Sequence, residues 1–319
     1  MSGSITDVSG LRVGHAHDAV GRTGVTVIWC DPPAVGSVDR RGAAVSTRQC
    51  DSLLPQHLLS RVDAVVLTGG SAFGLGASSG VMDALAARGA GMPTPGRPVP
   101  IVPCAALFDL GFGSGEAVPT PELAAQAFAA AGIETAEGSV GAGHGATVGK
   151  LFGLAGAMKG GVGTASRTRE DGLVVGALAA VNAWGDVIDS ATGAIVAGAR
   201  EPGGNFADIA RVLSTRPPAQ RPGFSMIDNT VLVVVATNAK LDKNLAGFVA
   251  RMAQTGLARA VRPCHGPYDG DVVFALSTGN QGADLPAIGQ MAADAVSEAI
   301  VRAVQKADGF GILPAVSDL

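Results

Sequence analysis

Five stretches of the chain are rich in valine, leucine, isoleucine and alanine, with few polar interruptions. Their lengths and their β-branched content are typical of strands, and glycine, proline or polar residues bound most of them. The predicted strands are Gly24–Cys30, Ala64–Thr68, Leu173–Asn182, Thr230–Thr237 and Val272–Thr278.

Four other segments place apolar residues at helical spacing, with charged or small residues between them. In the last segment, Ile288, Met291, Ala295 and Ile300 approximate one apolar face. Because strands and helices mix along the whole length, the pattern predicts a layered α/β or α+β fold. The predicted helices are Ser71–Ala87, Pro121–Ala131, Lys243–Val261 and Pro286–Lys306.

One segment, Ser214–Phe224, breaks the pattern of apolar runs. Its sequence, STRPPAQRPGF, contains three prolines, two arginines and a glycine, a composition typical of an exposed and extended connector. The predicted strand that begins at Thr230 follows it closely. No internal repeat and no further change of composition marks a second domain, so we expect one domain over residues 1–319.

The composition is that of a compact globular protein. Of the 319 residues, 47% are hydrophobic and only 16% are charged. The 46 glycines, roughly double the average usage, indicate many tight turns and close backbone contacts. With a net charge of -4 and no long basic run, the chain is not expected to bind nucleic acid.

The sequence predicts a cytoplasmic location. The first ten residues are polar and do not resemble a signal peptide. No stretch reaches the roughly 18 apolar residues that a membrane helix needs. Cys30, Cys50, Cys104 and Cys264 are far apart and form no C-x-x-C pair. They are expected to be buried, reduced thiols, and a cysteine nucleophile is the alternative.

Neither a metal ion nor a cofactor is expected. His15 and His17 form an H-x-H pair, but the chain has no H-E-x-x-H motif and no array of cysteine and histidine. It also has no G-x-S-x-G motif, which argues against the serine triad of an α/β-hydrolase.

Two glycine-rich segments resemble anion-binding loops. In Gly141–Leu151, His144 and Leu151 replace the glycine and the hydroxyl residue of a phosphate loop, so nucleotide binding is not expected. Lys150 at its end is either an ordinary surface lysine or part of a site. In Val65–Ser78, Ser71 could cap a helix whose first amides hold an anion or a substrate carbonyl, and close packing of strand and helix is the alternative.

Asp269 and Asp271 flank a glycine just before a predicted strand. An Asp-Gly turn is the simple interpretation. In an extended chain, however, the two carboxylates would point the same way and would repel each other without a nearby cation. Lys150 is a candidate for that cation.

The Asn229-Thr230 bond lies between the predicted connector and a predicted strand. A hydroxyl at this position suits a chain that cuts itself. Thr230 would attack the carbonyl of Asn229, and water would release the resulting ester. The new N-terminal threonine would then offer its hydroxyl as a nucleophile and its α-amine as a base, with an ordinary pKa of about 7.7–8. A simple turn at the asparagine is the alternative.

The sequence resembles the L-aminopeptidase/D-esterase family, which includes β-peptidyl aminopeptidases and nylon-oligomer endohydrolases. Six segments match family motifs in order along nearly the whole chain, and together they are highly specific. They are ITDVSGLRVGHAHD (Ile5–Asp18), VVLTGGSAFGL (Val65–Leu75), VPIVPCAALFDL (Val99–Leu110), GATVGK (Gly145–Lys150), NTVLVVVATNAKL (Asn229–Leu241) and DGDVVFALST (Asp269–Thr278).

The resemblance implies a four-layer α/β/β/α sandwich of the N-terminal-nucleophile type. It also implies cleavage between Asn229 and Thr230 into a 1–229 α chain and a 230–319 β chain, and a tetramer of such αβ units. The implied reaction is hydrolysis of amide bonds in small peptides or peptide-like substrates.

The resemblance also assigns roles to individual residues. Thr230 matches the nucleophile, and Lys150 matches a lysine that assists proton movement and stabilises charge. Asn182 matches an asparagine that donates to the oxyanion. Asp269 and Asp271 match an acidic pair that orients this network.

One position departs from the family pattern. Phe108 stands where related proteins often have a substrate-binding tyrosine, and a phenyl ring cannot donate a hydrogen bond. Two alternative functions therefore stay open. One is an acyltransferase that uses the same threonine, and the other is an uncut binding protein without activity.

Overall fold

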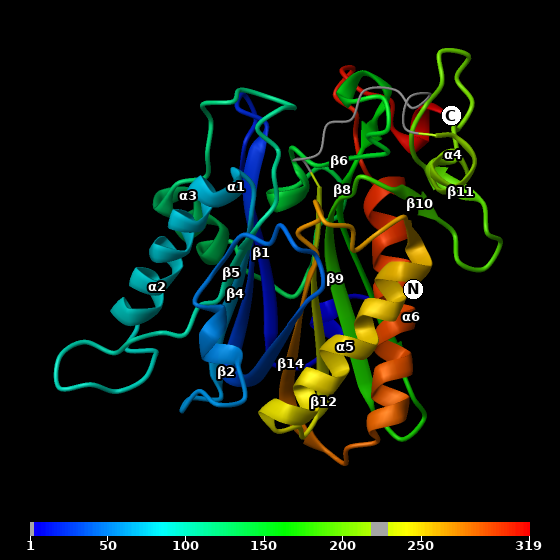
Figure 1. The fold of residues 1–319 in the computed structure, drawn as a ribbon. Helices are drawn as coiled ribbons and strands as arrows, with labels where there is room; N and C mark the ends of the chain where they lie inside the picture. The colour runs from blue at the N-terminus through cyan, green and yellow to red at the C-terminus, as the bar shows by residue number, and fades with distance from the viewer. Residues whose placement is uncertain (1–2, 218–228) are drawn as a thin grey trace.

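The computed structural model describes residues 3–217 and 229–319, which build four layers. Two β-sheets lie face to face in the middle, and helices cover the outer face of each sheet (Figure 1). The expected α/β/β/α sandwich is therefore confirmed.

The strands of both sheets belong to one hydrogen-bonded series in the order β3-β5-β4-β2-β14-β12-β9-β8, and β1 pairs with β2. Short strands form two small additional sheets, β11-β10-β13 and β6-β7. The strands are β1 (Leu11–Asp18), β2 (Thr23–Arg40), β3 (Thr47–Arg48), β4 (Arg61–Thr68), β5 (Cys104–Ala106), β6 (Thr147–Val148), β7 (Met158–Lys159), β8 (Gly161–Thr168), β9 (Val174–Asn182), β10 (Asp186–Ile188), β11 (Ile195–Ala197), β12 (Thr230–Ala239), β13 (Val261–Arg262) and β14 (Val272–Gln281).

Strand β2 links the two sheets because it belongs to both of them. Its residues 25–29 pair with β4, and its residues 35–40 pair with β14. The register with β4 shifts between Trp29 and Ala34, where two prolines interrupt the supply of backbone donors. The chain passes from one sheet to the other at this irregularity.

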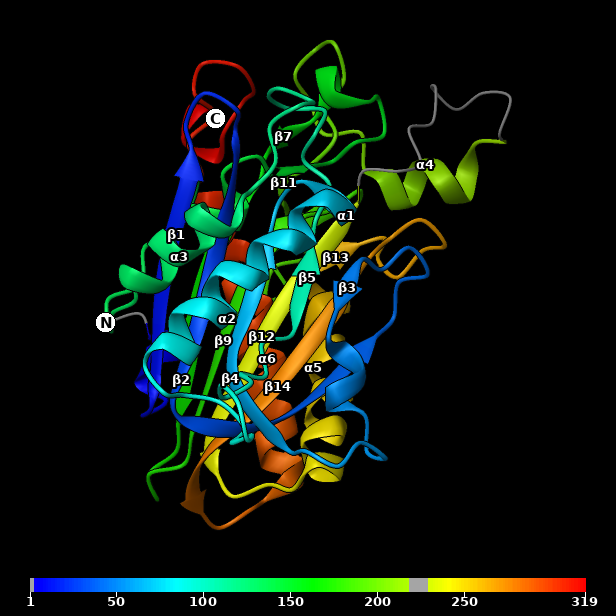
Figure 2. The same ribbon diagram turned by 90° about the vertical axis from the view of Figure 1, so that its left-hand side faces the viewer.

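Helices α2 and α3 cover the sheet that contains β4, and α5 and α6 cover the sheet that contains β12. Figure 2 shows α2 and α3 in front of their sheet, with α5 and α6 behind it. The helices are α1 (Ser71–Gly74), α2 (Ser78–Ala87), α3 (Pro121–Ala129), α4 (Ile209–Thr215), α5 (Lys243–Ala260) and α6 (Leu285–Gln305).

The two long helices begin at aspartates and pack closely together. The carboxylates of Asp242 and Asp284 each accept a hydrogen bond from the backbone amide three residues later, which caps α5 and α6. The helices meet at Gly256, where a Cβ atom would lie 2.1 Å from a backbone oxygen of α6. Only glycine allows so close a contact.

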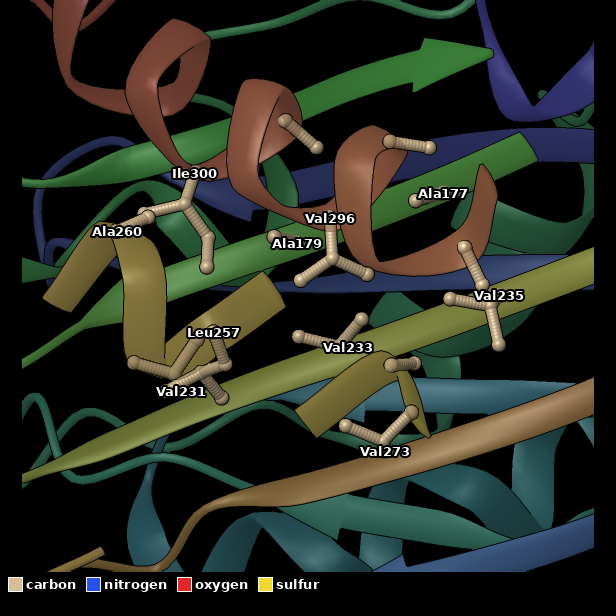
Figure 3. Packing of buried hydrophobic residues seen from close by; sticks show 14 of the residues in the cluster. Ala177, Ala179, Val231, Val233, Val235, Leu257, Ala260, Val273, Val296 and Ile300 are labelled. Carbon is tan, nitrogen blue, oxygen red and sulfur yellow. The ribbon is translucent and has the colours of Figure 1, made fainter. Parts of the chain in front are cut away.

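Both faces of the central strand β12 are buried, but in different cores. Val231, Val233 and Val235 pack toward α5 and α6 (Figure 3). The alternate residues Leu232 and Val234 lie in the core between the two sheets. This explains why the sequence of β12 is continuously apolar rather than alternating.

All five predicted strands and all four predicted helical segments are found, but β2 continues to Arg40, well beyond the predicted end at Cys30. The segment Ser71–Ala87 is not one helix, because a 3-10 turn at Leu75–Ala77 separates α1 from α2. Strands β1 and β8 were not predicted, since their sequences LRVGHAHD and GVGTASRT contain few large apolar residues.

The predicted connector is only partly described. Ser214 and Thr215 form the last turn of α4, which corrects the start of the connector, and residues 214–217 are exposed as expected. The prediction for residues 218–224 lies outside the described part of the chain.

In the core between the sheets, we expect stability to depend most strongly on the largest buried side chain. Phe274 of β14 is fully buried there. We expect Phe274→Ala to lower the free energy of unfolding by about 3–5 kcal/mol, because it leaves a cavity. Denaturant unfolding measures this value. Phe248→Ala on the exposed side of α5 is the matched control, and an equal loss in both variants would contradict the expectation.

Candidate active site

Thr230 is the first residue of β12 and lies directly opposite Asn182, the last residue of β9. Both side chains are buried. Since side chains alternate along a strand, Thr230 points to the same face as Leu232, toward the space between the sheets. Its hydroxyl Oγ1 lies 2.5 Å from the carbonyl oxygen of Asn229.

The carbonyl group of Asn229 is also held from the other side. Its oxygen accepts a hydrogen bond of 2.9 Å from the backbone amide of Gly270. A Cβ atom at position 270 would come within 2.6 Å of the Thr230 hydroxyl, so the close approach requires glycine. The carbonyl group of Asn229 thus has an amide donor on one side and the Thr230 hydroxyl on the other.

The side chain of Asn182 connects the two sheets. Its Nδ2 donates to the carbonyl oxygen of Phe108 at 2.8 Å, beyond the end of β5 in the other sheet. Its Oδ1 accepts from the backbone amide of Thr147 at 3.0 Å and from Nζ of Lys150 at 3.0 Å. These contacts fix the orientation of the amide.

Lys150 is buried, with 4% of its surface exposed. Besides Oδ1, its ammonium group contacts the backbone oxygen of Asn182 at 3.2 Å. The alternative that Lys150 is an ordinary surface lysine is therefore wrong. The ammonium group of Lys150 therefore lies next to β9, the strand that pairs with β12 at Thr230.

The loop before Lys150 is held by a second buried lysine. Lys159 is fully buried and donates to the backbone oxygens of Gly143, Ala146 and Gly160 at 2.8–2.9 Å. Burial lowers the pKa of Lys159 to about 7. The glycine-rich segment before Lys150 is therefore buried and has defined backbone contacts.

The two aspartates have different partners. Asp271 accepts a 2.8 Å hydrogen bond from the amide of Val231, and its other oxygen accepts from the backbone and ring nitrogens of His265 at 3.0 and 2.9 Å. Asp269 accepts from the amide of Gly266 at 2.6 Å. Asp271 therefore positions the residue that follows Thr230.

The electrostatics of the pair follow from burial and from nearby charges. Burial and the charge of Asp271 raise the pKa of Asp269 to about 6, although Lys150 and His265 act in the opposite direction. Burial lowers the pKa of His265, but the hydrogen bonds to Asp271 and Cys264 outweigh it and raise the pKa to about 10. Near neutral pH, His265 and Asp271 form an ion pair.

The sequence did not single out His265, Gly270 or Thr147 as site residues. His265 and Gly270 belong to the turn-rich segment between α5 and β14. Their closeness to Asp271 in the sequence was the signal that could have identified them as site residues. Thr147 acts through its backbone amide, which no residue type reveals.

Phe108 lies beside the site and lines a small pocket of about 70 Å³ together with Thr147 and Lys150. Its carbonyl oxygen, not its ring, contacts Asn182. All seven residues expected at the site are thus brought together by the fold. They are Phe108, Lys150, Asn182, Asn229, Thr230, Asp269 and Asp271.

The double glycine before α1 does not offer free amides. The Gly70 amide donates to Asp109, and the Ser71 amide donates to the carbonyl oxygen of Leu107. Gly70 is the N-cap and no side chain caps the helix, so the prediction that Ser71 caps it is wrong. A Cβ atom at Gly74 of α1 would lie 1.9 Å from the backbone oxygen of Gly69, which agrees with the alternative of close strand–helix packing.

None of the four cysteines is in a disulfide. Cys30, Cys50 and Cys104 are buried, Cys264 is half-buried, and all four are free thiols. Burial raises the pKa of Cys50 to about 11 and that of Cys30 to about 12, so these thiols stay protonated at neutral pH.

Metal ligation was not expected at His15 and His17. His15 contacts the Thr26 hydroxyl, and the ring of His17 stacks on that of His144. Within residues 3–217 and 229–319, no three or more histidine, cysteine or acidic side chains are arranged to hold a metal ion.

The His265–Asp271 pair predicts a pH-dependent stability. The pKa of His265 is raised from 6.5 to about 10, so its contribution is complete below pH 6.5 and is lost as the pH rises through 10. Because the ring is 22% exposed and solvent screens the charge, we expect the ion pair to raise the free energy of unfolding by about 2 kcal/mol.

The measurement is denaturant unfolding of the wild type and His265→Asn at pH 6 and pH 10. Asparagine suits the positive φ of 57° at this position, so the backbone is preserved. The gap between the two proteins should shrink at pH 10, and a constant gap would contradict the ion pair.

The chain matches the model of Peptidase family S58 over residues 3–312. It is 40% identical to an uncharacterized aminopeptidase of Mycobacterium tuberculosis, covering 99% of this chain and 97% of the relative. It is 30% identical to a 6-aminohexanoate-oligomer endohydrolase of Paenarthrobacter ureafaciens, covering 85% and 74% of the two chains.

Solved structures agree with this relationship. A β-aminopeptidase of Burkholderia sp. superposes with a TM-score of 0.69 at 25% identity, over 96% of this chain and 88% of the other. The L-aminopeptidase D-Ala-esterase/amidase of Ochrobactrum anthropi, described as a variant of the Ntn hydrolase fold, gives 0.73 at 21% identity, over 97% and 88%. The chain belongs to Peptidase family S58 and is a hydrolase of amide bonds with an N-terminal-nucleophile hydrolase fold.

Proposed function

We propose that this protein is a self-processing aminopeptidase whose nucleophile is the hydroxyl of Thr230. The observation that carries the proposal is the arrangement at the Asn229-Thr230 bond. The hydroxyl lies 2.5 Å from the carbonyl oxygen of Asn229, and that oxygen accepts the Gly270 amide. A nucleophile and a donor to the developing oxyanion thus meet at one peptide bond.

Self-cleavage follows two steps. Thr230 Oγ1 bonds to the carbonyl carbon of Asn229, the C–N bond breaks, and the nitrogen of Thr230 becomes a free amine that takes up the hydroxyl proton. Water then hydrolyses the ester and releases the carboxylate of Asn229. The products are the chains 1–229 and 230–319.

The cleaved enzyme repeats this chemistry on a substrate. The Thr230 hydroxyl attacks the substrate carbonyl, the new α-amine accepts the proton, and the leaving amine departs with a proton. Water then restores the hydroxyl. Lys150 and Asn182 supply positive charge and hydrogen bonds next to the reacting group. Asp271 positions β12 through the amide of Val231.

The substrate in this proposal is a small peptide or a peptide-like amide. The names of the relatives support it, since they are an aminopeptidase, a β-aminopeptidase and a 6-aminohexanoate-oligomer endohydrolase. No helix among the described residues is long and apolar enough to cross a membrane. The free cysteines support a reducing, cytoplasmic location. Assembly into a tetramer of processed units is part of the same proposal.

The first test is the intact mass of the denatured protein. We expect the wild type to give two fragments, Met1–Asn229 and Thr230–Leu319. Thr230→Ala should remain a single chain of about 31.6 kDa and should be inactive, because alanine has no nucleophile.

Thr230→Ser is the matched control for this test. It retains a hydroxyl and should still be cleaved at the same bond. Cleavage of Thr230→Ala at that bond would disprove the assignment. A wild type that stays uncut and does not react with an activated ester would favour the non-catalytic alternative.

A second test concerns the close contact between Gly270 and the Thr230 hydroxyl. In Gly270→Ala, the added Cβ displaces the Thr230 hydroxyl, since it would otherwise lie 2.6 Å away. We expect self-cleavage to slow about 10- to 100-fold. A time course of intact mass measures it. Gly282→Ala, where a Cβ meets nothing within 4 Å, is the control, and equal rates in both variants would refute this role.

A further inference from the structure

A buried carboxylate, Asp109, lies next to the site and takes no part in the steps proposed above. The residue is 4% exposed and follows Phe108 directly in the chain. Burying a charge costs free energy unless the group is paired or hydrogen-bonded. Burial raises the pKa of this carboxyl to about 6, although its hydrogen bonds and the charge of Lys159 act in the opposite direction. Near neutral pH the group is therefore mainly ionised, and both of its oxygens accept hydrogen bonds.

Each oxygen of the Asp109 carboxylate is held by a different part of the chain. Oδ1 accepts the backbone amide of Gly70 at 2.7 Å, and Oδ2 accepts the hydroxyl of Thr23 at 2.7 Å. The backbone of Leu107 adds two hydrogen bonds to the segment 68–71. The chain beyond β5 is thus fixed against the double glycine before α1 and against the start of β2.

The peptide bond that precedes Asp109 carries a contact of the site. Its carbonyl oxygen belongs to Phe108 and accepts Nδ2 of Asn182 at 2.8 Å. Because a peptide unit is planar, the direction of this oxygen is coupled to the backbone of Asp109. The hydrogen bonds of the Asp109 carboxylate therefore hold one partner of the Asn182 amide in place.

The same carboxylate packs against the segment that holds the other end of this amide. Oδ1 of Asn182 accepts from the backbone amide of Thr147, two residues after Gly145. A Cβ atom at Gly145 would lie 2.7 Å from Oδ2 of Asp109, and one at Gly69 would lie 2.1 Å from the same oxygen. Both glycines leave the space that the carboxylate fills, so Asp109 contacts both segments that bind the Asn182 side chain.

We infer that Asp109 is a positioning residue for the reaction at Thr230 and that it acts through the amide of Asn182. Its carboxylate fixes the two backbone segments between which that amide is held. Without it, the Phe108 carbonyl and the Gly145 segment can move, and the amide loses its fixed direction. The inference rests on the proposed function, in which Asn182 supplies hydrogen bonds next to the reacting group.

Self-cleavage of Asp109→Ala, followed by intact mass over time, gives the first test. We expect the rate to fall about 10- to 100-fold, because a small misplacement of a group beside the reacting bond has an effect of this size. Asp109→Asn keeps an acceptor for the Gly70 amide and should stay within about fivefold of the wild type. Self-cleavage needs no separate substrate, so this readout excludes a role limited to substrate binding. An unchanged rate in Asp109→Ala would overturn the inference.

Asp63→Ala is the matched control for the loss of a buried carboxylate. Asp63 is 1% exposed and accepts the backbone amide of Ile101 at 2.8 Å and the guanidinium group of Arg61. It lies near the start of β4, whereas Asp109 lies beyond the end of the parallel strand β5. Asp63→Ala should lower the free energy of unfolding but should be cut within about twofold of the wild-type rate. Equal slowing in both variants would mean general destabilisation and would overturn the inference.

A double-mutant cycle with Asn182 separates positioning from a purely structural role. In Asn182→Ala the amide that Asp109 holds is absent, so adding Asp109→Ala should change the rate by no more than about twofold. Thr23→Val removes only the donor to Oδ2 and should show the same lack of additivity, with a smaller effect alone. A further loss of about tenfold or more in the double variant would contradict action through Asn182.

Folding and acylation are measured for every variant, by denaturant unfolding and by reaction of Thr230 with 4-nitrophenyl acetate. If Asp109→Ala does not fold, Thr23→Val takes its place in the cycle. If Asn182→Ala stays uncut, the comparison of Asp109→Ala with Asp109→Asn and Asp63→Ala decides. A wild type that is cleaved and acylated, with Asp109 variants that match it, refutes only the positioning role. A wild type that is neither cut nor acylated refutes the proposed function as well.

Discussion

The antiparallel register between β9 and β12 is the constraint on which the site depends. It sets Thr230 opposite Asn182, at the ends of two strands that are buried on both faces. A shift of one residue would turn every side chain of β12 to the other face. Val231 would then leave the core beneath α5 and α6, and Thr230 would no longer face Asn182. The packing of the strand interior thus fixes the chemistry at its end.

The same burial explains why polar groups gather at this end of the strand. The side chains of residues 231–236 of β12 are all apolar and buried, and the backbone of this stretch is paired with β9 and β14. At its start, the pairing with β14 has not yet begun. The carbonyl of Asn229 and the amide of Val231 are therefore satisfied by the segment before β14, through the Gly270 amide and the Asp271 carboxylate. One segment holds both sides of Thr230.

Much of this could be predicted, but only where the signal is local or the family resemblance is specific. The apolar runs that end at Asn182 and begin at Thr230 marked both strand ends correctly. The contacts across the layers had no such signal. Asn182 meets the backbone of Phe108 because β5 lies in the opposite sheet, and this depends on the order of strands. The ion pair of His265 likewise depends on how a turn folds back, which spacing alone does not determine.

Lys150 and Lys159 have different roles: Lys159 supports the fold, and Lys150 contacts the candidate site. Lys159 uses its three hydrogen bonds on backbone carbonyls, and these bonds offset the cost of burying its amine. The contacts fix the segment that runs from Gly143 to Lys150. Lys150 is then held where its ammonium group meets Asn182 rather than solvent. A lysine on a mobile loop would lose side-chain conformational entropy each time it bound Asn182. The rigid loop removes that cost before any substrate arrives.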